Sequence, residues 1–198
     1  MIDRTIMLAI VSVLFGTWAY AADCNNGGRY EVMNDGTVQD CRTGLIWLKD
    51  ANCTDSLGLP GIDKSGGSLD WYDALKWVAA LHSGHCGLSD NSEAGFWRLP
   101  TITEWMAMIA SANKQYFAAP SLTNAAGTAK WATNGDAFDN VQSADFYWSS
   151  TRCALQELCA WSVDFVNGGA FTNPKVIDIC VWPVRGGQSG EFGNVIIQ

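Results

Sequence analysis

The sequence lacks the short motifs by which several large functional classes are recognised. It contains no nucleophile elbow, phosphate-binding glycine loop, H-E-x-x-H zinc motif, C-x-x-C pair or EF-hand spacing. Charge is also scarce, at 16% of 198 residues, and 12 Lys+Arg stand against 20 Asp+Glu for a formal net charge of −8. Because a polyanion-binding protein normally carries a basic stripe, this balance argues against nucleic acid as a partner.

Long apolar runs are absent beyond the first segment of the chain. Residues 1–21 predict a secretory signal peptide, since Arg4 precedes an apolar stretch over residues 6–18 and Ala19 and Ala21 supply small residues before a cleavage site. A bilayer span needs about 20 apolar residues, so we expect no transmembrane anchor in the mature chain. The prediction is an exported protein that is periplasmic, on the cell surface or extracellular.

The seven cysteines all follow this segment, and export makes disulfides permissible. Cys153 and Cys159 flank a short segment between two strand-like runs, and Cys53 and Cys86 bracket the first expected helix. We therefore predict these two bridges. Because seven is odd, one of the other three cysteines is a candidate for a free or intermolecular thiol, and their pairing stays open (Cys24, Cys41 and Cys180).

Local patterns predict strands, two helices, a long loop and further strands. A hairpin is expected at Asn34-Asp35-Gly36, and a strand over residues 44–49. Apolar spacing predicts one helix from about residue 69 to 81 and a second over residues 102–112, which begins at a capping box formed by Thr101 and Glu104. Residues 115–140 lack periodicity, and a loop of this length tends to be functional.

The last part of the chain contains short runs with strand character. These runs cover residues 146–150, 160–165, 170–172 and 181–185. Residues 24–188 are then one α+β domain, and residues 189–198 are a flexible tail in which 195–197 could begin a strand.

Six strings together resemble one bacterial family, the Lcl C-terminal domain family (domain of unknown function 1566). The strings are NDGTVQDCRTGLIWLKDANC at 34–53, WYDAL at 71–75, GHCGLSD at 84–90 leading to FWRLPTITEW at 96–105, YWSST at 147–151, AWSVDFVNG at 160–168 and VWPVRGGQ at 181–188. The pattern is also similar to the wider C-type-lectin-like fold, which includes the formylglycine-generating enzymes.

The resemblance implies a disulfide-stapled fold with two helices packed on twisted antiparallel strands and a long irregular loop. It implies that residues 44–49 pair with residues 181–185 and that residues 115–140 belong to a variable loop region that carries the site. A fold of this kind hosts many activities, so the resemblance by itself supplies none.

Three chemical interpretations compete with plainer ones. Cys153 and Cys159 resemble the late cysteine pair that formylglycine-generating enzymes use with copper, but a hairpin disulfide is the default in an exported protein. His82, His85 and Cys86 lie close together, but their spacing is poor for zinc, and His near a helix C-terminus complements the helix dipole. The oxygen-rich loop residues listed below could bind calcium, but solvated turns often have this composition.

Most of five tryptophans that lie in the family strings are expected in the core (Trp47, Trp71, Trp105, Trp148 and Trp182). Trp131, in the long loop, is predicted to be partly exposed, as a platform on which a sugar could stack. The candidate ligand residues lie in residues 115–145 and 166–175. They are Trp131, Asn134, Asp136, Asp139, Asn140, Asn167, Phe171, Asn173 and Lys175.

These observations favour a secreted or cell-envelope recognition module without catalytic activity or a required cofactor. Its expected partner is a glycan or protein surface, and neutral sugars fit an acidic chain better than the sulfated glycans associated with the adhesin of this family. One alternative is a structural or assembly component of an exported envelope complex, with homo-oligomers as one form. A copper- or thiol-dependent oxidase is the remaining alternative.

Overall fold

The computed structural model describes residues 24, 27–113 and 120–186, and in this part the chain folds as an α+β domain. The strands are β1 (Tyr30–Val32), β2 (Thr37–Asp40), β3 (Ile46–Leu48), β4 (Ser68–Leu69), β5 (Phe146–Arg152), β6 (Cys159–Asp164), β7 (Gly169–Pro174), β8 (Ile179–Cys180) and β9 (Val184–Arg185). The helices are α1 (Trp71–Ala80) and α2 (Ile102–Asn113). The expected signal peptide, the tail at 189–198 and the strand suggested at 195–197 lie outside the described residues.

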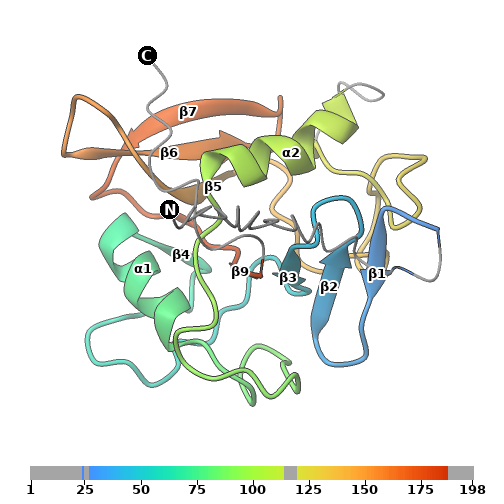
Figure 1. Cartoon of the computed structure of the whole chain (residues 1–198). Helices are drawn as coiled ribbons and strands as arrows, with labels where there is room; N and C mark the ends of the chain where they lie inside the picture. Colours follow the sequence, from blue (N-terminus) through green and yellow to red (C-terminus); the bar gives the residue numbers. More distant parts are fainter. Residues whose placement is uncertain (1–23, 25–26, 114–119, 187–198) are drawn as a thin grey trace, which may run out of the picture.

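The strands form two sheets, which Figure 1 shows next to each other. One sheet has the order β1-β2-β3-β9, and the other has the order β4-β8-β5-β6-β7. The pairs are antiparallel except for β5 and β8, which run parallel. Helix α2 packs against β5 and β6, and α1 packs against β5.

The first sheet brings the two ends of the domain together. Ile46 of β3 lies opposite Arg185 of β9, and Trp47 lies opposite Val184. This pairing confirms the expected contact between residues 44–49 and 181–185, although the strand in the second range is limited to β9. Strands β5, β6 and β7 confirm the runs expected at 146–150, 160–165 and 170–172; β5 and β7 are longer than expected, and β6 is shifted one residue towards the N-terminus.

The hairpin between β1 and β2 forms where the sequence predicts it. The Met33 N–H donates to the Thr37 carbonyl at 2.9 Å, and Asp35 Oδ1 accepts from the Thr37 N–H at 3.0 Å. Gly36 has φ +85, and a Cβ there would meet the Gly87 carbonyl oxygen at 2.3 Å. Only glycine allows the hairpin tip to approach the 87–88 backbone this closely.

Both expected helices are present, with small changes at their ends. The Asp70 side chain accepts from the Asp73 N–H at 2.8 Å, so α1 begins at Trp71 and Leu69 belongs to β4. Helix α2 begins at the predicted capping box, in which the Glu104 N–H donates to Thr101 Oγ at 3.2 Å. In the described residues, neither helix has the length or apolar character to cross a bilayer.

Indole rings fill the space between the two sheets and α2. The Trp105 ring lies 4.9 Å from the Trp47 ring and 5.8 Å from the Trp182 ring, measured between centroids. The Trp105 N–H donates to the Trp148 carbonyl at 3.0 Å and the Trp182 N–H donates to the Leu48 carbonyl at 2.7 Å, whereas the buried Trp47 N–H has no hydrogen-bond partner in the described residues. The five tryptophans of the family strings, most of which are expected in the core, are all buried.

Three disulfides link loops to the core elements, and one cysteine is unpaired. The Cys53–Cys86 and Cys153–Cys159 bridges confirm the two predicted pairs. The third bridge joins Cys24 to Cys41, so the free thiol is Cys180, which is buried in β8. Because Cys180 is inaccessible, a disulfide to a second chain through it is not supported. Three bridges are typical of an oxidising, exported environment.

Candidate functional site

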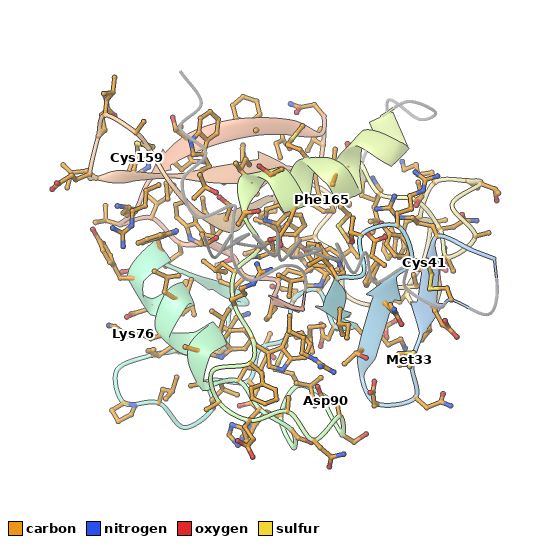
Figure 2. All side chains as sticks on the ribbon, in the orientation of Figure 1. Met33, Cys41, Lys76, Asp90, Cys159 and Phe165 are labelled. Carbon is orange, nitrogen blue, oxygen red and sulfur yellow. A yellow bond between two sulfur atoms is a disulfide. The ribbon has the colours of Figure 1, made fainter. Side chains whose placement is uncertain are left out.

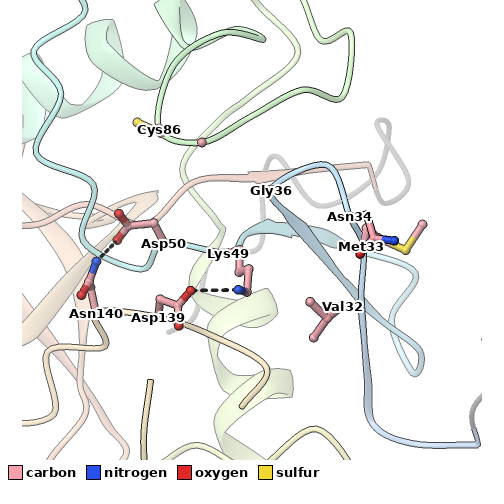
Figure 3. Close-up of a pocket in the computed structure, with 10 residues that line it drawn as sticks. Val32, Met33, Asn34, Gly36, Lys49, Asp50, Cys86, Asp139 and Asn140 are labelled. Atoms are coloured by element: carbon pink, nitrogen blue, oxygen red, sulfur yellow. Dashed lines mark hydrogen bonds and ion pairs between the residues drawn. The ribbon is translucent and has the colours of Figure 1, made fainter. Parts of the chain in front are cut away.

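An open pocket of about 490 Å³ lies where four segments meet (Figure 3). These are the β1–β2 hairpin, the chain after β3, the loop at residues 86–87 and the end of the long loop. The side chains that give it its character are Val32, Met33, Asn34, Lys49, Asp50, Asp139 and Asn140.

Backbone hydrogen bonds fix the segments that form this pocket. The Lys49 N–H donates to the Gly36 carbonyl at 3.0 Å, which ties the end of β3 to the hairpin. The Asp139 N–H donates to the Lys49 carbonyl and the Ala51 N–H donates to the Asp139 carbonyl, both at 2.9 Å. The long loop therefore adds a short parallel bridge beside β3, at Asp50 and Asp139.

Two side-chain pairs lie on the floor of the pocket. Lys49 Nζ is 2.9 Å from Asp139 Oδ2, and Asn140 Nδ2 donates to Asp50 Oδ1 at 3.0 Å (Figure 3). Asp139 Oδ1 also accepts from the Gly135 N–H at 2.6 Å. In the described residues, Asp50 Oδ2 and the Asn34 amide make no hydrogen bond, so they are available to a ligand. The floor holds one more carboxylate than ammonium group.

Asn140 adopts an uncommon backbone conformation at the pocket, with φ +55. Asparagine tolerates this left-handed region better than most residues. Its N–H donates to Asn134 Oδ1 at 2.8 Å, and its carbonyl accepts from Gln142 Nε2 at 2.9 Å. These two hydrogen bonds fix the loop backbone around Asn140, whose side chain lines the pocket.

The structure separates the first group of predicted ligand residues. Asp139 and Asn140 line the pocket, and Asn134 supports it through the Asn140 backbone. Asp136 is directed elsewhere, because its Oδ1 accepts from the Ala125 N–H at 2.9 Å.

The prediction that Trp131 is partly exposed is wrong. Only 8% of this residue is accessible, and its indole N–H donates to the Phe138 carbonyl at 3.1 Å. The loop folds around the ring because burying so large an apolar surface stabilises a segment that has no helix or strand of its own. Trp131 therefore offers no stacking platform.

The second group of predicted ligand residues lies around β7 and contributes nothing to the pocket. The Asn167 side chain accepts from the Gly169 N–H at 2.7 Å, and Asn173 Nδ2 donates to Ser162 Oγ at 2.8 Å. Lys175 is buried, with its ammonium 4.7 Å from the centre of the Trp71 ring and donating to the Glu157 carbonyl. Only Phe171 keeps a half-exposed apolar side chain.

The sequence reasoning missed the part of the pocket that comes from the hairpin and β3. The sequence predicts Asn34 only as a turn residue, and it contains Lys49 and Asp50 only as part of a family string. The available signal was that a polar pair, Lys49-Asp50, directly follows an apolar strand. Their meeting with residues 139–140 depends on contacts between distant segments, which local patterns do not encode.

The histidine pair does not form a metal centre with Cys86, because Cys86 is in a disulfide. His82 Nδ1 lies 2.8 Å from the Ala80 carbonyl at the end of α1, and His85 Nδ1 lies 2.8 Å from Asp55 Oδ2. Hydrogen bonds from His85 and from the Leu57 N–H lower the pKa of Asp55. No group of three or more His, Cys, Asp or Glu side chains within the described ranges is arranged to hold a metal ion.

Calcium binding stays a prediction, and the pocket has few oxygen ligands that are not already engaged. Both carboxylate oxygens of Asp139 are engaged, one with the Lys49 ammonium and one with the Gly135 N–H. The oxidase interpretation requires Cys153 and Cys159 as free thiols, and the structure joins them in a disulfide. The geometry therefore gives that interpretation no support.

Comparison with known families agrees with the observed fold, and the matched range includes most of the pocket. The model of the Lcl C-terminal domain family matches residues 36–185. This chain therefore belongs to the Lcl C-terminal domain family. No curated protein matches the sequence. The matched range includes every pocket residue except those of the hairpin at 32–34.

Proposed function

We propose that the protein is a non-catalytic recognition module of the cell envelope or the extracellular space, and that it binds a carbohydrate in the pocket at Asp50 and Asn140. The observation that carries the proposal is the preformed, open floor of carboxylate and amide groups, with Asp50 Oδ2 and the Asn34 amide available. Such groups donate to and accept from vicinal hydroxyl groups, which is how a few polar groups fix a small ligand.

The rim of the pocket can contact the apolar face of a sugar ring. Val32 and Met33 are both more than one third exposed and line the side opposite Asp50. Their apolar surfaces can cover the C–H groups of a pyranose while the polar floor binds its hydroxyls. Since the floor has an excess carboxylate and the chain carries a net charge of −8, neutral sugars are favoured over sulfated ones.

Two further parts of the proposal concern fold and location. The pairing of β3 with β9, the two helices and the long loop at the pocket support a C-type-lectin-like fold. The three disulfides and the signal-peptide pattern at residues 1–21 support export.

A glycan array of neutral and charged sugars, followed by calorimetry on the best ligand, tests the proposal. We expect Asp50→Asn and Asn34→Ala each to weaken binding by about tenfold, because each removes a group that contacts hydroxyls. Asp63→Asn is the matched control, since Asp63 is an exposed carboxylate outside the pocket. Wild-type protein that binds no glycan on the array contradicts the proposal, as does binding that both pocket variants leave unchanged.

A further inference from the structure

The outer edge of β7 is the most extensive unpaired strand edge in the described part of the fold. Strand β7 ends the five-stranded sheet and pairs with β6 over its whole length (Figure 1). The other strands at sheet ends are shorter, since β1 has three residues and β4 and β9 have two each. An unpaired edge presents a row of N–H and C=O groups to any strand that approaches.

The register of β7 on β6 shows which backbone groups point outward. The Lys175 N–H donates to the Leu158 carbonyl at 2.9 Å, which continues the ladder in which Pro174 lies opposite Cys159. In an antiparallel pair, alternate residues bond to the same neighbour. Gly169, Phe171 and Asn173 therefore bond to β6. The N–H and C=O groups of Ala170 and Thr172 point away from it.

The edge lacks the devices that usually prevent strands from pairing. Edge strands are commonly protected by charged side chains, bulges or short length. The β7 sequence, GAFTNP, contains no charged residue, and its pairing with β6 shows no register shift. The nearest charged residues on either side, Asp164 and Lys175, are both buried. Among the described residues, the only protective feature of this edge is Pro174 at the last position of β7.

We propose that β7 pairs antiparallel with β7 of a second copy of this chain, across a two-fold axis at Phe171. In this register Ala170 of each copy exchanges backbone hydrogen bonds with Thr172 of the other. Phe171 lies opposite Phe171 of the second copy, at the position between the two bonded pairs where side chains come closest. The five-stranded sheets then form one continuous sheet through both molecules.

Exposed apolar side chains lie at the centre of β7 and in the turns at both of its ends. Phe171, the central residue, is 44% exposed and already packs edge-on against Phe146, with ring centroids 5.8 Å apart. Val166, five residues before Phe171, is 44% exposed, and Val176, five residues after it, is 76% exposed. The antiparallel arrangement places the turn that holds Val166 in one copy at the same end of the paired strands as the turn that holds Val176 in the other. This self-complementarity favours a second copy over an unrelated strand.

Self-association through β7 is independent of the proposed carbohydrate pocket. The pocket is lined by residues from 32 to 50, 86–87 and 139–140, and none comes from β7. Figure 1 shows β7 and the β1–β2 hairpin on different sides of the molecule. The dimer can therefore form whether or not a sugar binds, and each copy keeps an accessible pocket.

Sedimentation velocity of the oxidised full chain over a range of concentrations tests the proposal. We expect a reversible monomer–dimer equilibrium whose Kd rises about tenfold or more in Thr172→Pro, which removes an outward N–H, and in Phe171→Lys, which places like charges opposite each other. Phe96→Lys is the matched control, because Phe96 is exposed elsewhere. Circular dichroism checks that each variant is folded.

A cysteine variant tests the register directly. Phe171→Cys places two thiols at a non-hydrogen-bonded antiparallel pair, where Cα atoms are close enough for a disulfide. We expect a dimer on non-reducing gels for Phe171→Cys and none for Phe96→Cys. A wild-type chain that is monomeric at every concentration overturns the proposal. A dimer that persists unchanged in Thr172→Pro and Phe171→Lys also overturns it.

Discussion

At the scale of single residues, the protein buries Lys64, whose ammonium is held by carbonyl groups rather than by an ion pair in the described residues. Lys64 Nζ donates to the carbonyls of Cys53 and Gly67, at 2.5 and 2.9 Å, and lies 4.5 Å from the centre of the Trp77 ring. These contacts tie the loop before α1 to the helix. Burial lowers the pKa of Lys64 from 10.5 to about 8, because the charged form loses its hydration.

The depressed pKa of Lys64 predicts a specific pH dependence of stability. Between pH 8 and 10.5 the unfolded chain keeps the proton on Lys64 while the folded chain loses it. The unfolded state then binds more protons, so this residue makes stability rise with pH across that window, by up to about 3 kcal/mol. Burial raises the pKa of Cys180 to about 11 and that of Tyr147 well above 10, and both act in the opposite direction.

The test is therefore the difference between wild type and Lys64→Met in urea unfolding at pH 7, 9 and 10. We expect the free energy of unfolding of wild type, minus that of Lys64→Met, to become more positive from pH 8 upward. Lys130→Met, which replaces a partly exposed lysine, serves as the control. A difference that stays constant across the three pH values contradicts the assignment.

Burial of individual residues in loops could not be predicted from the sequence. Trp131, Lys175 and Lys64 all lie in segments of irregular composition, and none belongs to a periodic pattern that marks a buried face. Their burial depends on carbonyl groups and rings that come from other segments, such as Phe138 for Trp131 and Trp71 for Lys175. The same dependence explains why only Asp139 and Asn140 of the predicted ligand residues line the pocket.

At the scale of elements, one ion pair and one capping box share a single carboxylate at the start of α2. Glu104 accepts two hydrogen bonds from the Arg98 guanidinium, at 2.7 and 2.6 Å, and one from the Thr101 N–H at 2.8 Å. Partial burial raises the pKa of Glu104, but these bonds outweigh it and lower the pKa overall. The same Arg98 also donates to the Gly186 carbonyl after β9 at 3.0 Å.

Glu104→Gln is expected to lower the free energy of unfolding by about 1–2 kcal/mol at pH 7, because the charge-assisted bonds weaken. The folded-state pKa of Glu104 is below its unfolded value of 4.5, so its contribution is present above that pH and is lost as pH falls through the folded pKa. Urea unfolding at pH 7 and pH 3 should show the deficit shrinking in acid. An equal deficit at both values, or the same deficit in the exposed control Glu157→Gln, contradicts this role.

Elements with strong local signals were predictable, and short ones were not. The Asn34-Asp35-Gly36 turn and the Thr101–Glu104 box each specify their own backbone, so the hairpin and α2 appear where expected. Strands β4 and β8 have two residues each, too few for an alternating pattern. They exist because Ser68 and Leu69 meet Cys180 and Ile179 across the fold. The pairing of β3 with β9 came from the family resemblance rather than from local pattern.

At the scale of the whole molecule, the disulfides close loops of different length, and their contributions should differ accordingly. Cys53–Cys86 spans 33 residues and Cys153–Cys159 spans 6. The loop-entropy relation gives about 4 kcal/mol for the first and about 2 kcal/mol for the second. We therefore expect the Cys53→Ala/Cys86→Ala double variant to lose more stability than Cys153→Ala/Cys159→Ala in chemical unfolding.

The two double variants should also differ at the pocket, because Cys86 is part of its lining. Loss of Cys53–Cys86 is expected to weaken ligand binding, whereas loss of Cys153–Cys159, at the other end of the molecule from Met33 in Figure 2, is expected to leave it unchanged. Equal stability losses, or a larger loss for the six-residue loop, contradict the entropic ranking.

The pairing of β3 with β9 also sets the order in which the chain can acquire structure. Ile46 pairs with Arg185, and the Trp47 ring packs against Trp182, so the central core cannot assemble until residues 182–185 have been synthesised. Contacts between such distant segments slow folding, because loop closure must precede the gain from packing. The nascent chain therefore lacks its central core until nearly the whole domain has been synthesised.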